Sequence, residues 1–517
     1  MRKILLTLTL LIISIFVVAC GNDSTEPASK EPEANKDEVE GSQEIIYATT
    51  SDAPGLSPID TNDGTSASVI IQIYETLFVL DPDTMEPEPL LAESYDTPDD
   101  LTWEIKLREG IEFHDGTPFN AEAVKYTFDQ LKDPDRAAPR ASLLAPITEV
   151  EVVDEYTVAL KTDEPYGPML STLSHSNASI VSPTADQEGD INMEPVGTGP
   201  FVLDEWVQGD SIVLAKNEDY WRDPAKLDKV TYRIVPEMST AISMLETGEA
   251  HFVKGITANH LSRVENMAET ELQMKEGVRV QHLEFNTEVE PFNDLVFRQA
   301  ISHAINTEAY VEQLNGLGVH NKNFIGPKIF GYNEDDQNEA YDYNPEKAKE
   351  LIEQSGFSGE TLKITASNSE DNVQMAEIVQ HQLSEVGLDV EIELLELGAF
   401  AEAARGGDFQ MAFMGWANNV PDASELLDPK LHSNHIGSTN LTRYNNPELD
   451  KLIEEGRFSV DQDYRLEKIR EANLLAMKEA PWLVMKHEVV TLAHHESIKG
   501  LVISPNEEWR LYNVSVE

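Results

Sequence analysis

The sequence has almost no cysteine, since Cys20 is the one thiol in 517 residues. A single thiol excludes an internal disulfide. Cys20 stands at the end of an apolar run and at the start of a polar one, outside any stretch that reads as a folded core. A buried structural thiol is the alternative, because free cysteines are usually buried. The position favours an N-terminal processing signal.

Positive charge is also scarce. The chain has 38 Lys and Arg residues against 94 Asp and Glu residues, and its net charge is −56. Such an excess of carboxylates argues against nucleic acid or an anionic lipid surface as a partner. It is typical of an extracellular protein that a dense negative surface keeps soluble at high salt or high pH. We therefore interpret the excess of acidic residues as a means of keeping the surface solvated and not as a binding site.

Long apolar runs are missing except at the N-terminus, where Arg2 and Lys3 precede the apolar residues 4–19. A membrane-spanning helix needs about 20 apolar residues, so this run predicts a secretory signal instead. Residues 17–20, Val-Val-Ala-Cys, resemble the lipobox of bacterial lipoproteins. The resemblance implies a signal peptide over 1–19 and lipid attachment at Cys20. Residues 20–43 lack aromatic side chains and predict a flexible acidic tether.

Signatures of common enzymes are absent from the sequence. It contains no G-x-S-x-G nucleophile motif, no P-loop and no dinucleotide-binding fingerprint. The histidines of 486–496 lack the i, i+4 pair of zinc proteases because position 491 is Thr, and those of 432–435 form only a weak chelator pattern. We therefore expect a protein that is no enzyme and holds neither cofactor nor metal.

Helix and strand patterns alternate in the second half of the chain. Asn344, Pro345 and Gly356 mark the start and end of one helix. Strand-like segments follow at 362–367 and 388–395, with helical spacing between them. Strands that alternate with helices of this length predict a layered α/β domain.

The segment 76–192 has a different pattern, rich in hairpins. Asn120 is suited to cap a helix over 121–131, and 148–162 is typical of a hairpin. We expect a small α+β domain here. The length of the chain after the tether also predicts more than one domain.

Four segments resemble, in order, those of the extracellular solute-binding protein family 5, the receptors of peptide and nickel ABC importers. They lie at residues 72–131, 196–206, 285–306 and 407–416. Residues 61–77 and 324–335 are most similar to the dipeptide, oligopeptide and glutathione-type branch. The resemblance covers the chain from Ile45 to Glu517.

The resemblance implies an α/β, two-lobed periplasmic-binding-protein-like (Venus flytrap) fold with an extra α+β domain inserted in the first lobe. Ligand is expected between the lobes, which close over it. The crossing connections are expected near residues 285 and 487. The implied parts are lobe I over 44–75, 193–285 and 488–517, the insert over 76–192, and lobe II over 286–487.

A strand predicted over Phe409–Gly415 leads into the first group of candidate site residues. Ligands of α/β sheets bind outside the carboxyl ends of strands. We therefore expect Trp416, Asn418, Asn419 and Asp422 to face the cleft, where Trp416 offers apolar contact and Asp422 a carboxylate.

The family pattern sharpens the prediction for this loop. In oligopeptide binders an Asp at the position of Asn419 holds the peptide's α-amino group, so that role is lost here. Glutathione-type members have an acid at the position of Asp422, which we favour as the partner of a ligand cation. The alternative is that Asp422 caps the helix that begins near Ala423.

Other candidates are an arginine, a turn and two residues of the insert. Arg405, before a Gly-Gly turn, could bind a ligand carboxylate, with a plain surface arginine as the alternative. The turn could line the pocket or be a plain solvated turn. The two residues of the insert could close one end of the pocket. The turn is Asn62, Asp63 and Gly64, and the insert residues are Arg140 and His175.

Together these features predict a substrate-binding lipoprotein of an ABC importer that captures short peptides and delivers them to the permease subunits. We expect a monomer, anchored to the extracellular face of the membrane by its lipid, without nucleic-acid partners. Alternatives are a receptor of the same fold for an oligosaccharide or a nickel complex, a cell-surface hydrolase, and an adhesin or signalling co-receptor.

Overall fold

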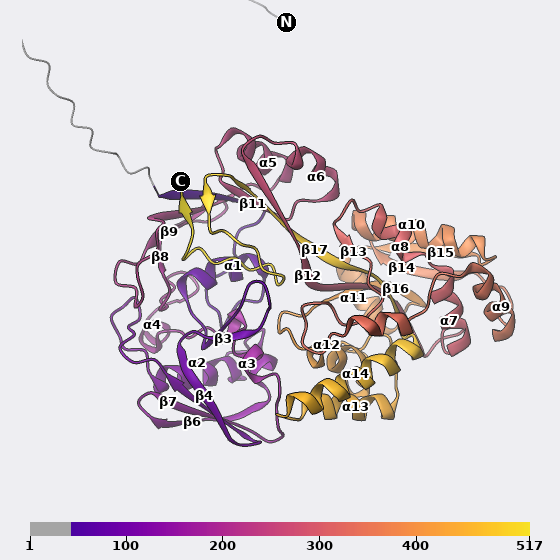
Figure 1. Ribbon diagram of the computed structural model, residues 1–517, viewed down its shortest axis with the longest axis horizontal. Coiled ribbons are helices and arrows are strands. Elements are labelled where there is room, and N and C mark those ends of the chain that lie inside the picture. The colour runs from indigo at the N-terminus through magenta and orange to yellow at the C-terminus, as the bar shows by residue number, and fades with distance from the viewer. Residues whose placement is uncertain (1–42) are drawn as a thin grey trace, which may run out of the picture. The chain divides into compact units, whose positions relative to one another are not determined.

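A computed structural model describes residues 43–517, and Figure 1 shows their arrangement. Cys20, the predicted signal peptide and all but the last residue of the predicted tether lie outside the described residues. Within 43–517, no helix combines the length and the apolar character that crossing a membrane requires.

An 11-stranded sheet takes strands from both lobes and none from the segment 76–192. Its strands come from distant parts of the sequence, which explains why the order was not readable from local patterns. In spatial order they are β15 (Val390–Leu395), β14 (Leu362–Ser367), β16 (Met411–Ala417), β12 (Thr270–Phe285), β17 (Trp482–His495), β11 (Phe252–Lys254), β1 (Glu44–Thr49), β10 (Lys229–Ile234), β9 (Ser211–Lys216) and β8 (Phe201–Val207), with β13 (Gly318–Val319) beside β17.

Lobe I is built on β1, which pairs in parallel with β10 and with β11. The β8–β9 hairpin extends this half of the sheet. The helices of lobe I are α1 (Gly64–Ile73), α5 (Met238–Thr247) and α6 (Ala258–Glu265), and β18 (Ile498–Lys499) pairs with β19 (Ser515–Val516).

Lobe II contains the predicted layered α/β unit. Strand β14 pairs in parallel with both β15 and β16, and Asn344 caps the helix that ends at the left-handed Gly356. The helices are α7 (Leu295–Ala304), α8 (Thr307–Glu312), α9 (Pro345–Ser355), α10 (Glu370–Glu385), α11 (Leu397–Gly406), α12 (Ser424–Leu431), α13 (Pro447–Arg457) and α14 (Gln462–Glu479), with 3₁₀ turns at Glu334–Glu339 and Ser433–His435.

The segment predicted as the insert has its own four-stranded sheet, and Asn120 caps its main helix as expected. The sheet order is β4 (Ala92–Asp99), β5 (Thr102–Leu107), β7 (Thr157–Thr162) and β6 (Ile147–Asp154). The remaining elements are β2 (Phe78–Leu80), β3 (Pro87–Pro89), α2 (Ala121–Lys132), α3 (Met169–Thr172), α4 (Pro183–Glu188) and 3₁₀ turns at Ala141–Leu144 and Ser176–Ala178.

The hydrophobic cores divide the molecule differently from its sheets. One core contains Ile45 and Tyr47 of β1 together with Trp103 and Leu160 of the insert sheet, so the insert and lobe I share it. Three further clusters of the described residues lie in lobe II, apart from single residues such as Met85. Because a close-packed core moves as a unit, the insert belongs mechanically to lobe I.

Two long paired strands, β12 and β17, connect the lobes. Their ladder is irregular between Glu276 and Val280 and again between Gln281 and His282. A β-bulge bends a strand and interrupts pairing, so a hinge is expected here. The resemblance predicted that the chain crosses between the lobes near residues 285 and 487. The irregular part of β12 lies several residues before position 285.

Candidate functional site

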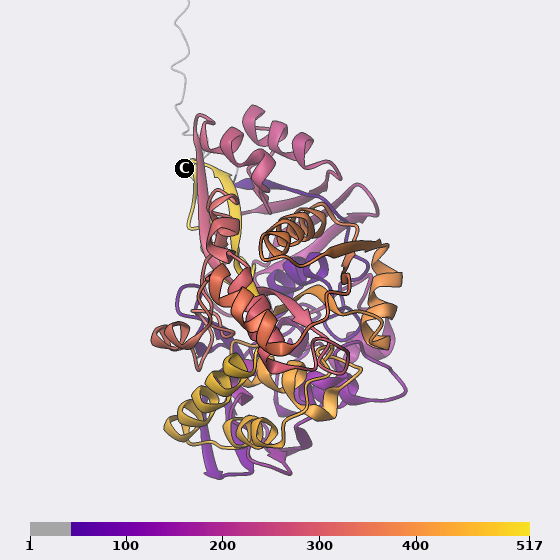
Figure 2. The same ribbon diagram turned by 90° about the vertical axis from the view of Figure 1, so that its right-hand side faces the viewer.

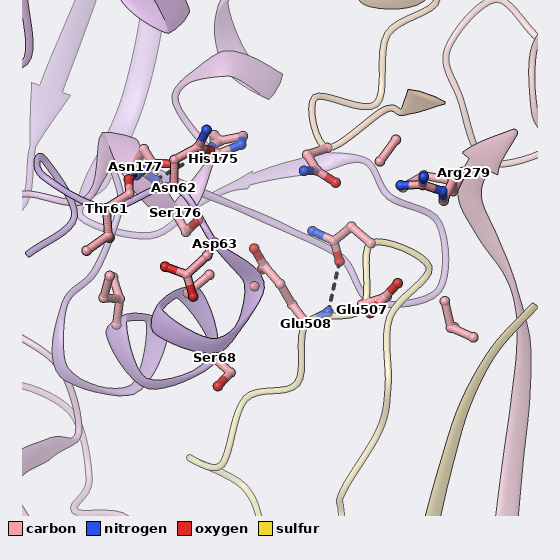
Figure 3. Close-up of a pocket in the computed structure, with 18 of the residues that line it drawn as sticks. Thr61, Asn62, Asp63, Ser68, His175, Ser176, Asn177, Arg279, Glu507 and Glu508 are labelled. Carbon is pink, nitrogen blue, oxygen red and sulfur yellow. Dashed lines mark hydrogen bonds between the residues drawn. The ribbon is translucent and has the colours of Figure 1, made fainter. Parts of the chain in front are cut away.

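A cavity of about 220 Å³ lies between the two lobes (Figure 3). Its wall combines the start of α1, the insert, the crossing strands β12 and β17, the loop after β16 and a loop near the C-terminus. Polar residues of the wall include Asn62, Asp63, Arg140, His175, Lys254, Arg279, Asn419, Glu507 and Glu508. A site that contacts both lobes is suited to a ligand that favours closure.

Asp63 forms the lobe I wall at the N-terminus of α1. Its Oδ1 accepts a hydrogen bond from the Ser66 N–H at 2.9 Å, which caps the helix. Its Oδ2 is buried and has no hydrogen-bond partner among the described residues. Asn62 and Gly64 line the same wall. The cap therefore fixes a carboxylate with one oxygen left for a ligand.

Arg140 and His175 bring the insert to the pocket. The guanidinium of Arg140 donates from Nη2 to His175 Nε2 at 3.2 Å, and Arg140 Nε is buried without a partner within the described chain. Burial lowers the pKa of His175 to about 3, and the nearby Arg140 charge acts in the same direction. At neutral pH His175 is therefore uncharged, and Arg140 supplies the cation of this wall.

Two acids near the C-terminus complete the pocket, and the sequence analysis did not identify them. Glu507 is paired with Lys254 at 2.6 Å. The Glu508 carboxylate has no ion-pair partner among residues 43–517, and burial raises its pKa although Arg510 opposes the shift. Glu508 and Asp63 line the same pocket (Figure 3). Glu508 lies in an irregular loop whose sequence carries no signal for this position.

The loop after β16 reaches the pocket with only part of the predicted group. Ala417 and Asn419 line the cavity at the carboxyl end of the strand. Trp416 instead donates from Nε1 to the carbonyl of Glu425 at 3.0 Å. Asn418 is 4% exposed, and its N–H donates to the Val278 carbonyl at 3.1 Å. Side chains alternate along the strand and its continuation, so Trp416 and Asn418 do not line the cavity that Ala417 and Asn419 reach.

Asp422 is engaged within lobe II and does not line this pocket. Its Oδ2 accepts from Arg465 Nη2 at 2.6 Å, and both side chains are almost fully buried. Its Oδ1 accepts from the Ser424 N–H at 3.0 Å and also from the Ser424 hydroxyl. The predicted role as partner of a ligand cation therefore has no geometric support, whereas the alternative, a role at the start of α12, agrees with these bonds.

Arg405 lies at the opposite edge of the sheet. It belongs to the end of α11, before the amino end of β16, whereas Ala417 at the carboxyl end lines the pocket. A strand of this length spans about 20 Å. Arg405 is exposed, and its carbonyl accepts from Arg443 at 2.8 Å. The predicted contact with a ligand carboxylate is therefore not supported by its position.

Histidines do not gather into a metal centre in the described part of the chain. No group of three or more His, Cys, Asp or Glu side chains there has the arrangement to hold a metal ion. The histidines of 486–496 lie on the strand β17, as their β-branched neighbours indicated, and not on a helix.

Comparisons with known proteins agree with this arrangement. The model of the family 'bacterial extracellular solute-binding proteins, family 5 Middle' matches residues 86–438 of this chain. The chain is 30% identical to the glutathione-binding protein GsiB of Escherichia coli over 90% of this chain and 93% of GsiB. It is 29% identical to the heme-binding protein A of Haemophilus influenzae over the full length of both.

A solved structure shows the same fold. The periplasmic binding protein DppA of Helicobacter pylori, solved with the peptide STSA, superposes with a TM-score of 0.75 and 29% identity, over 92% of this chain and 98% of DppA. The expected α/β periplasmic-binding-protein fold is confirmed. The chain belongs to the bacterial extracellular solute-binding proteins of family 5, a family that binds substrates and does not catalyse reactions.

Proposed function

We propose that this protein is the substrate-binding receptor of an ABC importer and captures short peptides or peptide-like molecules between its lobes. One observation carries the proposal: within the described residues, the pocket holds an Asp63 carboxylate oxygen without a partner on one wall and the Arg140 guanidinium on another. A small zwitterion with an ammonium group and a carboxylate matches these charges. The relatives that bind glutathione and a peptide support this class of ligand.

Asp63 and Glu508 are the proposed partners of the ligand's ammonium group. Both belong to lobe I, and Asp63 keeps one buried oxygen without a partner. Lobe II offers no replacement at this point, because position 419 is Asn and Asp422 is already paired with Arg465. Asn419 can still donate or accept a neutral hydrogen bond.

Arg140 is the proposed partner of a ligand carboxylate. A guanidinium fork suits a carboxylate, and the contact with neutral His175 keeps it oriented without cancelling its charge. Arg279 also lines the pocket, but Glu488 lies 3.4 Å away and neutralises it in part.

Transport would follow from closure of the lobes. A ligand that contacts both lobes stabilises the closed form by its differential affinity, and the closed form would dock on the permease. We propose that Cys20 carries the lipid anchor. A tether of about twenty residues would keep the receptor near its transporter at high effective concentration.

The test is to purify the protein from its native host and to identify the co-purified molecule by mass spectrometry. Calorimetry with glutathione and trialanine follows on the ligand-free protein. We expect peptide masses and binding of at least one probe. An oligosaccharide, a metal chelate, or no binding of either probe or any peptide would contradict the proposal.

A further inference from the structure

A second set of contacts joins the insert to lobe II outside the pocket. Tyr166 donates from its hydroxyl to Glu425 Oε1 at 3.2 Å, and the Gly167 N–H donates to the carbonyl of Arg457 at 3.2 Å. Glu425 and Arg457 belong to α12 and α13 of lobe II, which lie beside the insert in Figure 1 and Figure 2. Because the insert shares its core with lobe I, these bonds form only when the lobes meet.

Gly167 of the insert lies directly against Arg465 of lobe II. A Cβ built on Gly167 would lie 2.2 Å from Arg465 Nε and 2.5 Å from its Cδ and Cζ, far inside van der Waals contact. The φ of Gly167 is not positive, so its own backbone does not require glycine. The space for Arg465 requires it.

Arg465 cannot move aside easily. It is 1% exposed, its Nε donates to the Gly456 carbonyl at 2.9 Å, and its Nη2 donates to Asp422 at 2.6 Å. Its guanidinium also lies 4.6 Å from the centre of the Phe330 ring. A buried, multiply bonded guanidinium of this kind acts as a fixed surface.

Arg465 is connected to the binding pocket through Asp422. The Asp422 carbonyl accepts from Asn418 Nδ2 at 3.4 Å, and the neighbouring Asn419 lines the cavity. The Phe330 N–H donates to the Pro421 carbonyl at 3.0 Å, which fixes the same loop from its other side. The Arg465 side chain therefore both fixes the loop 418–422 through Asp422 and contacts the insert at Gly167.

We propose that Arg465 is a positioning residue that couples the two events. It holds the loop 418–422 in its binding conformation and, on closure, takes up Gly167 of the insert. The inference rests on the proposed function, since it needs a ligand-driven closure. It gives the Asp422–Arg465 pair a role in closure in place of the predicted ligand contact.

The experiment is Gly167→Ala, followed by small-angle X-ray scattering during titration with a hydrolysate of casein and with glutathione. The methyl group leaves the Asp422–Arg465 pair chemically unchanged, and in the open form it meets no partner. We expect the half-closing concentration to rise about tenfold or more, as overpacking against a fixed group costs. The melting temperature of the ligand-free protein is expected to stay unchanged.

The matched control is Gly189→Ala in the same insert, where the nearest atom to a new Cβ is the Ala185 carbonyl oxygen at 3.3 Å. It should change the half-closing concentration less than twofold. Tyr166→Phe removes one bond across the lobes and keeps the ring, so a rise of about fivefold is expected.

Failure has distinguishable forms. If the wild-type protein does not close with either probe, both the proposed function and this inference are wrong. If wild type closes and Gly167→Ala closes equally well, the receptor function stands and the coupling is wrong. If Gly167→Ala does not fold, Tyr166→Phe decides in the same way.

Discussion

Asp63 and Asp422 occupy comparable places in the two lobes, each after a sheet strand and just before a helix. On lobe I the cap bond to Ser66 uses one oxygen of Asp63, and the other stays without a partner at the pocket. On lobe II both oxygens of Asp422 are used, by Ser424 and by Arg465. The same local pattern therefore gives a free carboxylate in one lobe and a structural ion pair in the other.

The difference comes from a distant cation. Arg465 lies 43 positions after Asp422, in α14. No spacing rule predicts from the sequence that these two residues form an ion pair. Among residues 43–517 no cation is ion-paired with Asp63, and the N-terminus of α1 stabilises its charge instead. A carboxylate beside a cleft is thus available to a ligand only where the fold supplies no cation of its own.

Arg465→Ala should have the largest effect on stability and break the lobe II half of the comparison. It leaves Asp422 buried without its cation, and removing one member of a buried pair costs about 3–5 kcal/mol. Urea denaturation followed by circular dichroism measures the change in the free energy of unfolding. A loss below about 1 kcal/mol would show that Asp422 is not held by this pair.

His175 gives a prediction for pH. Its folded pKa, about 3, lies below the ordinary value of 6.5, so its contribution to stability is present above pH 6.5 and is lost as pH falls toward 3. Wild type should lose about 2 kcal/mol more than His175→Gln between pH 6.5 and pH 5. Urea denaturation at both pH values measures this, and equal losses would mean that His175 is protonated freely in the folded state.

Asp63→Asn should affect binding and leave stability nearly intact, in contrast to Arg465→Ala. Asparagine caps a helix as well as aspartate does, but it removes the charge for an ammonium group. Affinity for peptides with a free amino end should fall about tenfold, as for loss of a charged hydrogen bond, and affinity for N-acetylated peptides should not change. Calorimetry measures both.

Asp294→Asn is the matched control for this prediction. Asp294 also caps a helix, accepting from the Phe297 N–H at 3.1 Å, and it lies outside the pocket. If both variants weaken peptide affinity equally, Asp63 does not contact the ligand. The same holds if Asp63→Asn weakens the binding of N-acetylated peptides as much as that of peptides with a free amino end.

Arg405→Ala should have the smallest effect. The residue is exposed at the far edge of the sheet from the pocket, so we expect the affinity for glutathione to change less than twofold. A loss of tenfold or more in calorimetry would place the ligand at the other end of β16.

Local patterns were sufficient for much of the fold. The caps at Asn120 and Asn344 and the hairpin of β6 and β7 follow from neighbours in sequence, and the structure has them where expected. Strand β16 was predicted two residues early, at 409–415. Side chains alternate along a strand, so Ala417 and Asn419 reach the pocket, whereas Trp416 and Asn418, which were also predicted there, do not line it.

The site depended more on long-range contacts. Asn62, Asp63, Gly64, Arg140, His175 and Asn419 line the cavity, and their contact with a ligand stays a prediction. Glu508 was missed because its loop has no regular pattern, and its position depends on the packing of the neighbouring Trp509 in the lobe I core. Such placements arise from tertiary structure and not from spacing.

The most direct test of the central claim is a crystal structure of the protein with its co-purified ligand or with a bound peptide. The account predicts electron density for the ligand in the pocket between the lobes, with its ammonium group at Asp63 and Glu508 and a carboxylate at Arg140. Density beside Asp422 with an empty interlobe pocket, and an Arg465 that has left Asp422 for the ligand, would contradict it.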